Sequence, residues 1–345
     1  MRSPIRKRSS SSATLRSCRA SFLLAALAAA ALAAAEPLPK LGANAREVTV
    51  SGVSSGAYMA VQFQVAHSAS VSGVGALAGG PYYCAQGNVL AAYYNCTKPG
   101  VFTPLPSPGL LKAETQSLAQ AKSIDATSNL AHARVWLFSG TQDQTVDRAV
   151  VEALRDFYAG FGAQPVLVAD RPAGHAMVTE DKGNACGSSR TPFINNCGYD
   201  AAGELLRHLL GAKPPAGAAS GRVIRYDQNE FAAGDAAAIG LAAEGFAYVP
   251  KTCEGGGCAV HVAFHGCRQD AGDIGERFVL EAGYNRWADA NRLVVLYPQT
   301  VARYFPIFNP RACWDWWGYT GPLYHTKDGA QQRAVNAMIE RLASK

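Results

Sequence analysis

The sequence lacks several features, and each absence excludes a class of protein. Beyond the apolar run Phe22–Ala35, it has no hydrophobic stretch long enough to cross a membrane, and that run is itself short and rich in alanine. It has no excess of positive charge after residue 35, so we do not expect a nucleic-acid partner. Its cysteines form no paired C-x-x-C motifs, so we expect no metal site.

Residues 1–35 have the composition of a secretory signal peptide. Six basic residues and no acidic ones accompany the apolar run, and Ala33–Ala35 offers small residues for cleavage. Cys18 precedes the run, so we expect no lipid or membrane anchor. Removing those six from the 32 Lys and Arg leaves 26, equal to the 26 Asp and Glu. We therefore expect an exported protein, periplasmic or extracellular, with no net charge and a monomeric state.

Eight of the nine cysteines follow the predicted signal peptide, and an even number in an exported chain indicates disulfides. Each bridge adds about 2–4 kcal/mol of stability. Eight cysteines allow about 105 connectivities, and proximity along the chain favours one of them. The predicted pairs are Cys84–Cys96, Cys186–Cys197, Cys253–Cys258 and, by elimination, Cys267–Cys313.

Short β-rich runs alternate with helical patterns along most of the chain. The predicted strands are 48–50, 71–78, 134–138, 165–169, 223–226, 245–249, 259–264 and 293–297. The predicted helices are 57–67, 146–158, 274–290 and 331–342, and 84–111 is expected to be a surface excursion held by a disulfide. This alternation predicts an α/β fold with a mostly parallel sheet covered by helices on both faces. We expect one catalytic domain, residues 36–345, without a separate substrate-binding domain.

A G-x-S-x-G motif, Gly52 to Gly56, lies between a strand and a helix. At a sharp strand-to-helix turn the serine adopts a strained backbone, and flanking glycines relieve clashes with neighbouring elements. The hydroxyl of Ser54 then projects above the carboxyl edge of the sheet. The backbone N–H of Ser55 points to the same space, where it can bind a developing oxyanion.

A serine nucleophile needs a base, and the base needs an orienting carboxylate. In α/β-hydrolases these follow in the chain order Ser, Asp, His, each on a loop after a strand. Asp143 follows the strand at 134–138, and His175 follows the strand at 165–169. We expect these two residues to complete a catalytic triad with Ser54.

A second oxyanion donor is predicted from the late segment His265-Gly266-Cys267, which follows an apolar strand. In α/β-hydrolases a His-Gly loop of this kind usually precedes the nucleophile. Here it follows the serine by about two hundred residues, which a circular permutation of the same sheet explains. The backbone N–H of Cys267 would then be the second donor.

This order of motifs resembles the catalytic domain of polyhydroxybutyrate depolymerases, of the type whose oxyanion loop lies C-terminal to the serine motif. The resemblance covers nearly the whole chain after residue 35. It implies hydrolysis of poly(3-hydroxyalkanoate) esters by Ser54, Asp143 and His175, with Ser55 and Cys267 as the oxyanion hole. A feruloyl or acetyl-xylan esterase with the same triad is the first alternative. A non-catalytic exported binding protein of hydrolase fold is the second.

An aromatic cluster near the C-terminus is the expected substrate wall. Trp314, Trp316 and Trp317 lie close together in a predicted loop, and aromatic rings would bury the methyl-bearing repeats of a polyester. A bridge from Cys313 to Cys267 would hold this loop beside the oxyanion hole. Tyr82 and His265 are further candidates for the substrate cleft. The predicted acyl-enzyme mechanism requires no cofactor.

Overall fold

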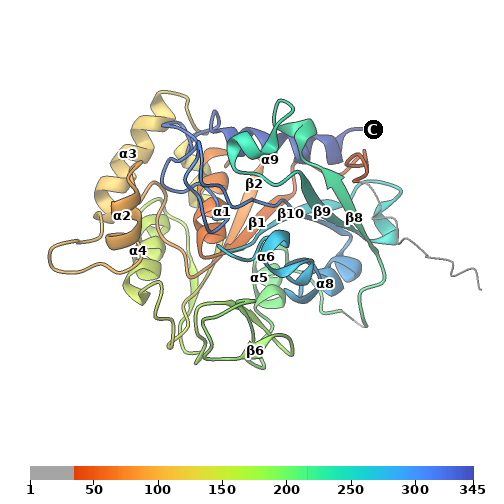
Figure 1. Ribbon diagram of the computed structural model, residues 1–345, viewed down its shortest axis with the longest axis horizontal. Helices are drawn as coiled ribbons and strands as arrows, with labels where there is room; N and C mark the ends of the chain where they lie inside the picture. Colours follow the sequence, from red (N-terminus) through yellow and green to blue (C-terminus); the bar gives the residue numbers. More distant parts are fainter. Residues whose placement is uncertain (1–34, 216) are drawn as a thin grey trace, which may run out of the picture. The chain divides into compact units, whose positions relative to one another are not determined.

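The computed structural model describes residues 35–215 and 217–345, so the predicted signal peptide, apart from Ala35, lies outside the described residues. Within them, the main sheet has eight strands in the order β4-β3-β2-β1-β10-β11-β9-β8 (Figure 1). A small sheet has the order β5-β7-β6. The strands are β1 Val48–Val53, β2 Val71–Leu77, β3 Arg134–Phe138, β4 Val166–Val168, β5 Met177–Thr179, β6 Asn184–Ala185, β7 Ile194–Asn196, β8 Arg222–Asp227, β9 Glu244–Val249, β10 Ala259–Phe264 and β11 Leu293–Tyr297.

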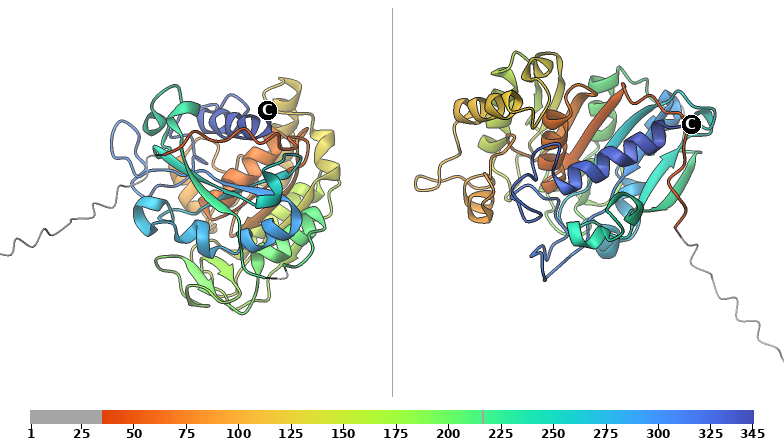
Figure 2. Two further views of the ribbon diagram at one scale, coloured as in Figure 1. Left: turned by 90° about the vertical axis from the view of Figure 1, so that its right-hand side faces the viewer. Right: turned by 90° about the horizontal axis from the view of Figure 1, so that it is seen from above.

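Helices cover both faces of the main sheet, as the alternating pattern predicts. Side chains of α1, α4 and α9 form one core layer, and those of α5, α7 and α8 form the other. In Figure 2 the blue helix α9 lies across the strands. The helices are α1 Ser55–Ala66, α2 Val89–Tyr94, α3 Pro108–Gln120, α4 Arg148–Ala159, α5 Ala201–Leu210, α6 Ala271–Ile274, α7 Arg277–Glu281, α8 Tyr284–Asn291 and α9 Ala330–Ala343, and the 3-10 turns are η1 Thr127–His132, η2 Asn229–Phe231, η3 Ala236–Ile239 and η4 Lys251–Cys253. Among the described residues, no helix has the length and apolarity that a bilayer crossing requires.

One expectation about secondary structure is wrong. The helix predicted at 274–290 is divided into α6, α7 and α8, because Gly275 and Gly283 have positive φ angles of 61° and 97°.

The excursion predicted at 84–111 is held by the Cys84–Cys96 disulfide, as expected, and contains helix α2 and the start of α3. Asn88 and Ser107 begin these helices by accepting backbone N–H bonds through their side-chain oxygens.

The sheet is parallel from β4 to β11, whereas β9 and β8 run antiparallel to their neighbours. The strand that precedes the serine, β1, pairs with β10, which precedes the predicted oxyanion loop. Gly52 lies opposite Phe264 in this register, so two segments far apart in sequence end at the same edge. This adjacency accounts for the late position of the oxyanion loop and confirms the permuted α/β-hydrolase fold.

A buried hydrogen-bond network fixes β1 against β10 beneath the site. The His261 ring on β10 bonds to Thr49 at 2.8 Å and to Ser51 at 2.7 Å, and both residues belong to β1. Ser51 in turn bonds to the hydroxyl of Tyr284 on α8 at 2.8 Å. Burial lowers the pKa of His261 to about 3, so the ring stays neutral at physiological pH.

All four predicted disulfides are present in the described part of the chain. Three of them close loops of 12, 11 and 5 residues, whereas Cys267–Cys313 spans 46 residues. Disulfides of this number fit an oxidising compartment and therefore export. The long bridge has a further consequence, because it ties the predicted oxyanion loop to the segment that carries the tryptophans.

Candidate active site

Ser54 occupies the turn between β1 and α1, with φ 57° and ψ −124°. This conformation is rare for a residue with a Cβ atom and marks a strained turn. An added Cβ at Gly52 would lie 2.2 Å from the carbonyl oxygen of Gly56. An added Cβ at Gly56 would lie 2.3 Å from the carbonyl oxygen of Phe264. The two glycines therefore let the start of α1 approach β1 and β10, which is the role the motif predicts.

His175 and Asp143 form a buried pair beside this turn. The Nδ1 atom of His175 lies 2.8 Å from Oδ2 of Asp143, and the two side chains are 9% and 2% exposed. The other carboxylate oxygen accepts the backbone N–H groups of Thr145 and Val146 at 2.7 and 3.0 Å. Both oxygens of Asp143 are thus engaged, which fixes the orientation of the imidazole and leaves its Nε2 edge for chemistry.

Ser54 and His175 line the same small cavity, whose volume is 180 Å³. Gly266 and Cys267 of the predicted oxyanion loop line it as well. The structure therefore brings together three segments that lie far apart in sequence: the serine turn, the histidine loop and the late His-Gly-Cys loop.

The backbone around Cys267 is held in place by its neighbours. The N–H of Gly266 donates to Oε1 of Gln269 at 2.7 Å, and the N–H of Arg268 donates to the carbonyl of Arg311 at 2.8 Å. The N–H of Cys267 lies between these two bonded groups and has no hydrogen-bond partner among the described residues. The N–H of Ser55 belongs to the first turn of α1, where backbone donors have no partner within the helix. Both groups are suited to bind an oxyanion.

Gln269 is a positioning residue that the sequence analysis missed. It is 1% exposed, and its amide nitrogen donates to the carbonyls of Pro192 and Phe193 at 3.2 and 2.8 Å. One side chain therefore joins the oxyanion loop to the segment that follows the histidine loop. A single glutamine in a loop has no sequence pattern that would reveal this role.

His265 is not in the wall of the cavity, which corrects its assignment as a substrate-binding residue. The ring is fully buried, and its Nε2 accepts the backbone N–H of Thr300 at 3.2 Å. Burial lowers its pKa to about 4, so it is neutral at physiological pH. His265 therefore supports the oxyanion loop from behind.

A larger groove of 710 Å³ adjoins the small cavity. The residues that line both cavities are Ser54, Thr145, Cys267 and Arg311. The aromatic side chains in the groove wall are Tyr58, Tyr93, Phe308, Trp316 and Trp317. The Trp316 ring stacks on Tyr58 at a centroid distance of 4.0 Å. Two of the three predicted tryptophans therefore lie where an apolar substrate would pack.

Trp314 and Tyr82 are placed differently from their predicted positions in the cleft. Both are 0% exposed and neither lines the groove. Trp314 packs edge-on against Phe264 at 4.9 Å, and the hydroxyl of Tyr82 donates to the carbonyl of His325 at 2.9 Å. Both rings are core residues: the loop that carries Trp314 folds back onto the end of β10, and Tyr82 packs beside His325.

Asp315 organises the segment that carries Trp316 and Trp317. Its carboxylate is 1% exposed and accepts backbone N–H bonds from 317, 318, 319 and 320, at distances from 2.7 to 3.3 Å. The Thr320 hydroxyl adds a fifth bond at 2.6 Å. Burial raises the pKa of Asp315, and the hydrogen bonds from Thr320, Gly318 and Tyr319 oppose that effect. The carboxylate thus holds the aromatic wall in one conformation.

We expect Asp315→Asn to loosen this wall. The amide group would direct its own N–H donors at the N–H and hydroxyl of Thr320, so a buried donor is left unsatisfied at a cost of about 2–4 kcal/mol. The thermal midpoint should fall by several degrees, and KM for an oligoester should rise more than kcat falls. The control is Asp328→Asn, because this side chain is exposed. Equal stability of the two variants would contradict the role given to Asp315.

The buried carboxyl group of Asp270, next to Gln269, should make the free energy of unfolding depend on pH. It is 5% exposed, and burial followed by the charge of Asp273 raises its pKa from 3.8 to about 6. Because the folded-state pKa is the higher one, Asp270 favours folding below pH 3.8, and this contribution is lost as the pH rises through about 6.

Asp270→Asn should therefore stabilise the protein at pH 8 by about 1–2 kcal/mol, after allowance for solvent screening. Asparagine can still accept the N–H of Gly272, now bonded at 3.0 Å, at the start of α6. Urea unfolding of both proteins at pH 4 and pH 8 tests this. The curves should converge at pH 4, and a difference that is the same at both pH values would contradict the assignment.

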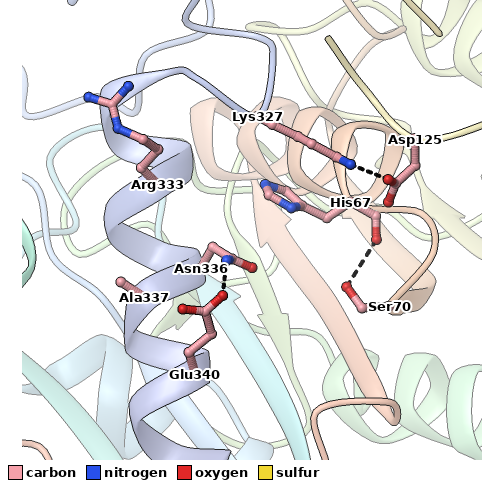
Figure 3. Close-up of a pocket in the computed structure, with 8 residues that line it drawn as sticks. All are labelled: His67, Ser70, Asp125, Lys327, Arg333, Asn336, Ala337 and Glu340. Atoms are coloured by element: carbon pink, nitrogen blue, oxygen red, sulfur yellow. Dashed lines mark hydrogen bonds and ion pairs between the residues drawn. The ribbon is translucent and has the colours of Figure 1, made fainter. Parts of the chain in front are cut away.

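A separate cavity of 540 Å³ lies at the other end of α1 (Figure 3). Two of its acidic side chains already have partners within the cavity: Lys327 bonds to Asp125, and Asn336 donates to Glu340. His67 lines it with a pKa that burial lowers to about 4. The nucleophile motif lies at the opposite end of the helix, so this cavity is not the reactive site.

The fold and the residues gathered at the carboxyl edge of the sheet define the chain as an α/β-hydrolase of the serine esterase class. Two curated proteins match it. A poly(3-hydroxybutyrate) depolymerase of Delftia acidovorans is 42% identical over 94% of this chain and 66% of its own length. A polyhydroxybutyrate depolymerase of Talaromyces funiculosus is 34% identical over 91% of this chain and 95% of its own length.

Solved structures agree with these relatives. A depolymerase from Penicillium funiculosum matches with a TM-score of 0.80 at 32% identity, over 90% of this chain and all of the other. A serine-to-alanine variant of a PHB depolymerase, complexed with an R3HB trimer, matches with a TM-score of 0.81 at 32% identity and the same coverage. No protein-family model matches the chain. The chain belongs to the polyhydroxybutyrate depolymerase family and is a carboxylic ester hydrolase, which confirms the resemblance found in the sequence.

The chain spans 66% of the length of the Delftia relative and nearly the whole length of the Talaromyces one.

Proposed function

We propose that this protein hydrolyses ester bonds of poly(3-hydroxybutyrate) or its oligomers through an acyl-enzyme intermediate. The observation that carries the proposal is one cavity lined by Ser54, His175 and Cys267, with His175 bonded to Asp143 at 2.8 Å. Its continuity with an aromatic groove supports a methyl-bearing, uncharged polyester as the substrate. The names of the relatives point to the same substrate.

Ser54 is the nucleophile in this proposal, and His175 is the general base that removes its proton. The ester carbonyl is attacked, and the N–H groups of Ser55 and Cys267 hold the tetrahedral oxyanion. Each such donor lowers the barrier by about 3–4 kcal/mol. His175 then protonates the leaving alcohol, and a water activated by the same ring releases the acid. Asp143 keeps the imidazole in the tautomer that this sequence of steps requires.

The groove walls formed by Trp316, Trp317 and Tyr58 are the proposed binding surface for the polyester. Burial of apolar surface there contributes about 25 cal/mol per Å². Phe308 and Tyr93 extend this wall outward, and both are more than half exposed. They therefore offer apolar surface to a chain longer than the groove.

We also propose that residues 36–345 act as one catalytic domain and that the protein works as a monomer outside the cytoplasm. Support for the first point is that residues 35–345 form one compact unit. Support for export is the set of disulfides, two of which join segments next to the site. The periplasm and the medium are both compatible with these observations.

Product analysis tests the substrate class. The mature protein is incubated with amorphous poly(3-hydroxybutyrate), and soluble products are separated and identified by mass. We expect 3-hydroxybutyrate and short oligomers. The same preparation is offered methyl ferulate and acetylated xylan, which a carbohydrate esterase would prefer. Turnover of these two substrates without release of hydroxybutyrate would overturn the proposal in favour of the carbohydrate esterase.

A further inference from the structure

The leaving-group side of the site carries positive charge that the hydrolysis of a neutral polyester does not need. Because His175 must protonate the leaving alcohol, the leaving group lies in the small cavity that His175 lines. Arg268 and Arg311 line this cavity too. Within the described residues, its lining contains no aspartate or glutamate, and neither arginine forms an ion pair there.

Arg311 is held close to the reacting centre by the backbone. Its carbonyl accepts the N–H of Arg268 at 2.8 Å, and Cys313, two residues further on, is bridged to Cys267. Arg311 also lines both the small cavity and the aromatic groove, a property it shares with Ser54 and Cys267. The backbone at Arg311 is therefore held by loop contacts, and the residue lines the junction of the two cavities.

An oligomer of a 3-hydroxy acid has one anionic group, the free carboxylate at its acid end. When the last ester bond is cleaved, that carboxylate belongs to the leaving fragment and is separated from the leaving oxygen by only a methine and a methylene carbon. The small cavity has a volume of 180 Å³ against 710 Å³ for the groove, which suits one hydroxy acid unit rather than several. The carboxylate would then lie within reach of the arginines.

We propose that Arg311, assisted by Arg268, forms a carboxylate subsite in the small cavity that selects the ester bond nearest the free acid end of an oligoester. Guanidinium groups bind carboxylates in a planar, bidentate geometry, which gives orientation as well as affinity. This inference rests on the proposed function and adds to it a preferred substrate class, the anionic oligoester, and a preferred point of cleavage.

The test compares the trimer of 3-hydroxybutyrate as its free acid and as its methyl ester at pH 8. The two differ in the terminal charge and in the methyl group that masks it, so only cleavage between hydroxybutyrate units is counted. We expect kcat/KM for the acid to exceed that for the methyl ester by about fivefold, a modest ratio because Arg311 is exposed to solvent. In Arg311→Gln the ratio should fall to about one. Arg311→Lys should keep part of the preference, because it keeps the charge and loses the bidentate geometry.

The matched control is Arg333→Gln, which removes the same charge from α9 at the cavity of Figure 3. It should keep the ratio of the unaltered protein. If circular dichroism shows that Arg311→Gln does not fold, the inference is tested with Arg268→Gln and with added salt. The preference for the acid should shrink in Arg268→Gln. It should also shrink for the unaltered protein in 0.5 M salt, because a Debye length of about 4 Å screens the charge interaction.

A ratio of one or below in the unaltered protein would overturn the inference, as would a ratio that neither arginine variant changes. These results leave the proposed function standing, because both trimers are still cleaved. If the unaltered protein cleaves neither trimer, the result counts against the proposed function itself and therefore against the carboxylate subsite as well.

Discussion

Ser54→Ala is expected to lower kcat for any ester substrate by about 10⁴–10⁶-fold and to abolish labelling by a fluorophosphonate probe. The loss follows from removal of the nucleophile, since no substitute hydroxyl lies at this turn in the same conformation. The thermal midpoint should stay within about two degrees, because alanine keeps a Cβ at the φ of 57° that Ser54 already tolerates.

The neighbouring serine provides the control for this experiment. Ser55→Ala preserves the backbone N–H of the oxyanion hole and removes only a hydroxyl that accepts the N–H of Trp314 at 3.3 Å. It should still be labelled by the probe. Full labelling of Ser54→Ala would show that the nucleophile is elsewhere, and the triad would have to be abandoned.

Gly56→Ala is expected to have the second large effect, on both stability and activity. The added methyl group would lie 2.3 Å from the carbonyl oxygen of Phe264 and 2.4 Å from that of His265. These are backbone atoms that cannot rotate away, so α1 must move from β10 at a cost of about 3 kcal/mol or more. The oxyanion loop follows directly after Phe264, so we expect kcat on a small soluble ester to fall as well.

Gly109→Ala in α3 is the matched control, because the nearest atom to its added Cβ is 3.9 Å away. This change should be neutral or stabilising by about 0.5–1 kcal/mol, as alanine favours a helix over glycine. Urea midpoints of the two variants and of the unaltered protein provide the measurement. Equal midpoints for Gly56→Ala and Gly109→Ala would show that α1 does not need its close approach to β10.

The sequence predicts those site residues that directly follow a strand. Asp143 and His175 each follow a short apolar strand, and parallel strands end at one edge of a sheet. The chain order alone therefore predicts that these two side chains lie close together, and in the structure they are 2.8 Å apart. Disulfides between near neighbours, such as Cys186–Cys197, were predictable for a similar reason, because a short loop keeps its two ends close.

The residues in the cluster near the C-terminus were not predictable one by one. Trp314, Trp316 and Trp317 lie in an irregular loop, which has no periodicity to indicate which rings face inward. Trp314 is fully buried, whereas the other two line the groove. Asp315 stands between the first ring and the others, and its bonds to the N–H groups of Gly318 and Tyr319 fold the backbone that follows Trp317.

The sequence by itself determined the class of fold, the nucleophile motif, the order of the candidate triad and the pairing of the cysteines, because these depend on local turns and on the sequence of strands. Only the tertiary structure decided that β10 lies beside β1, that His265 and Trp314 support the site from behind, and that Gln269, Asp315 and Arg311 surround it. The physical reason is that these roles depend on contacts between segments as much as 259 residues apart, which are fixed by packing and by buried hydrogen bonds rather than by any local pattern.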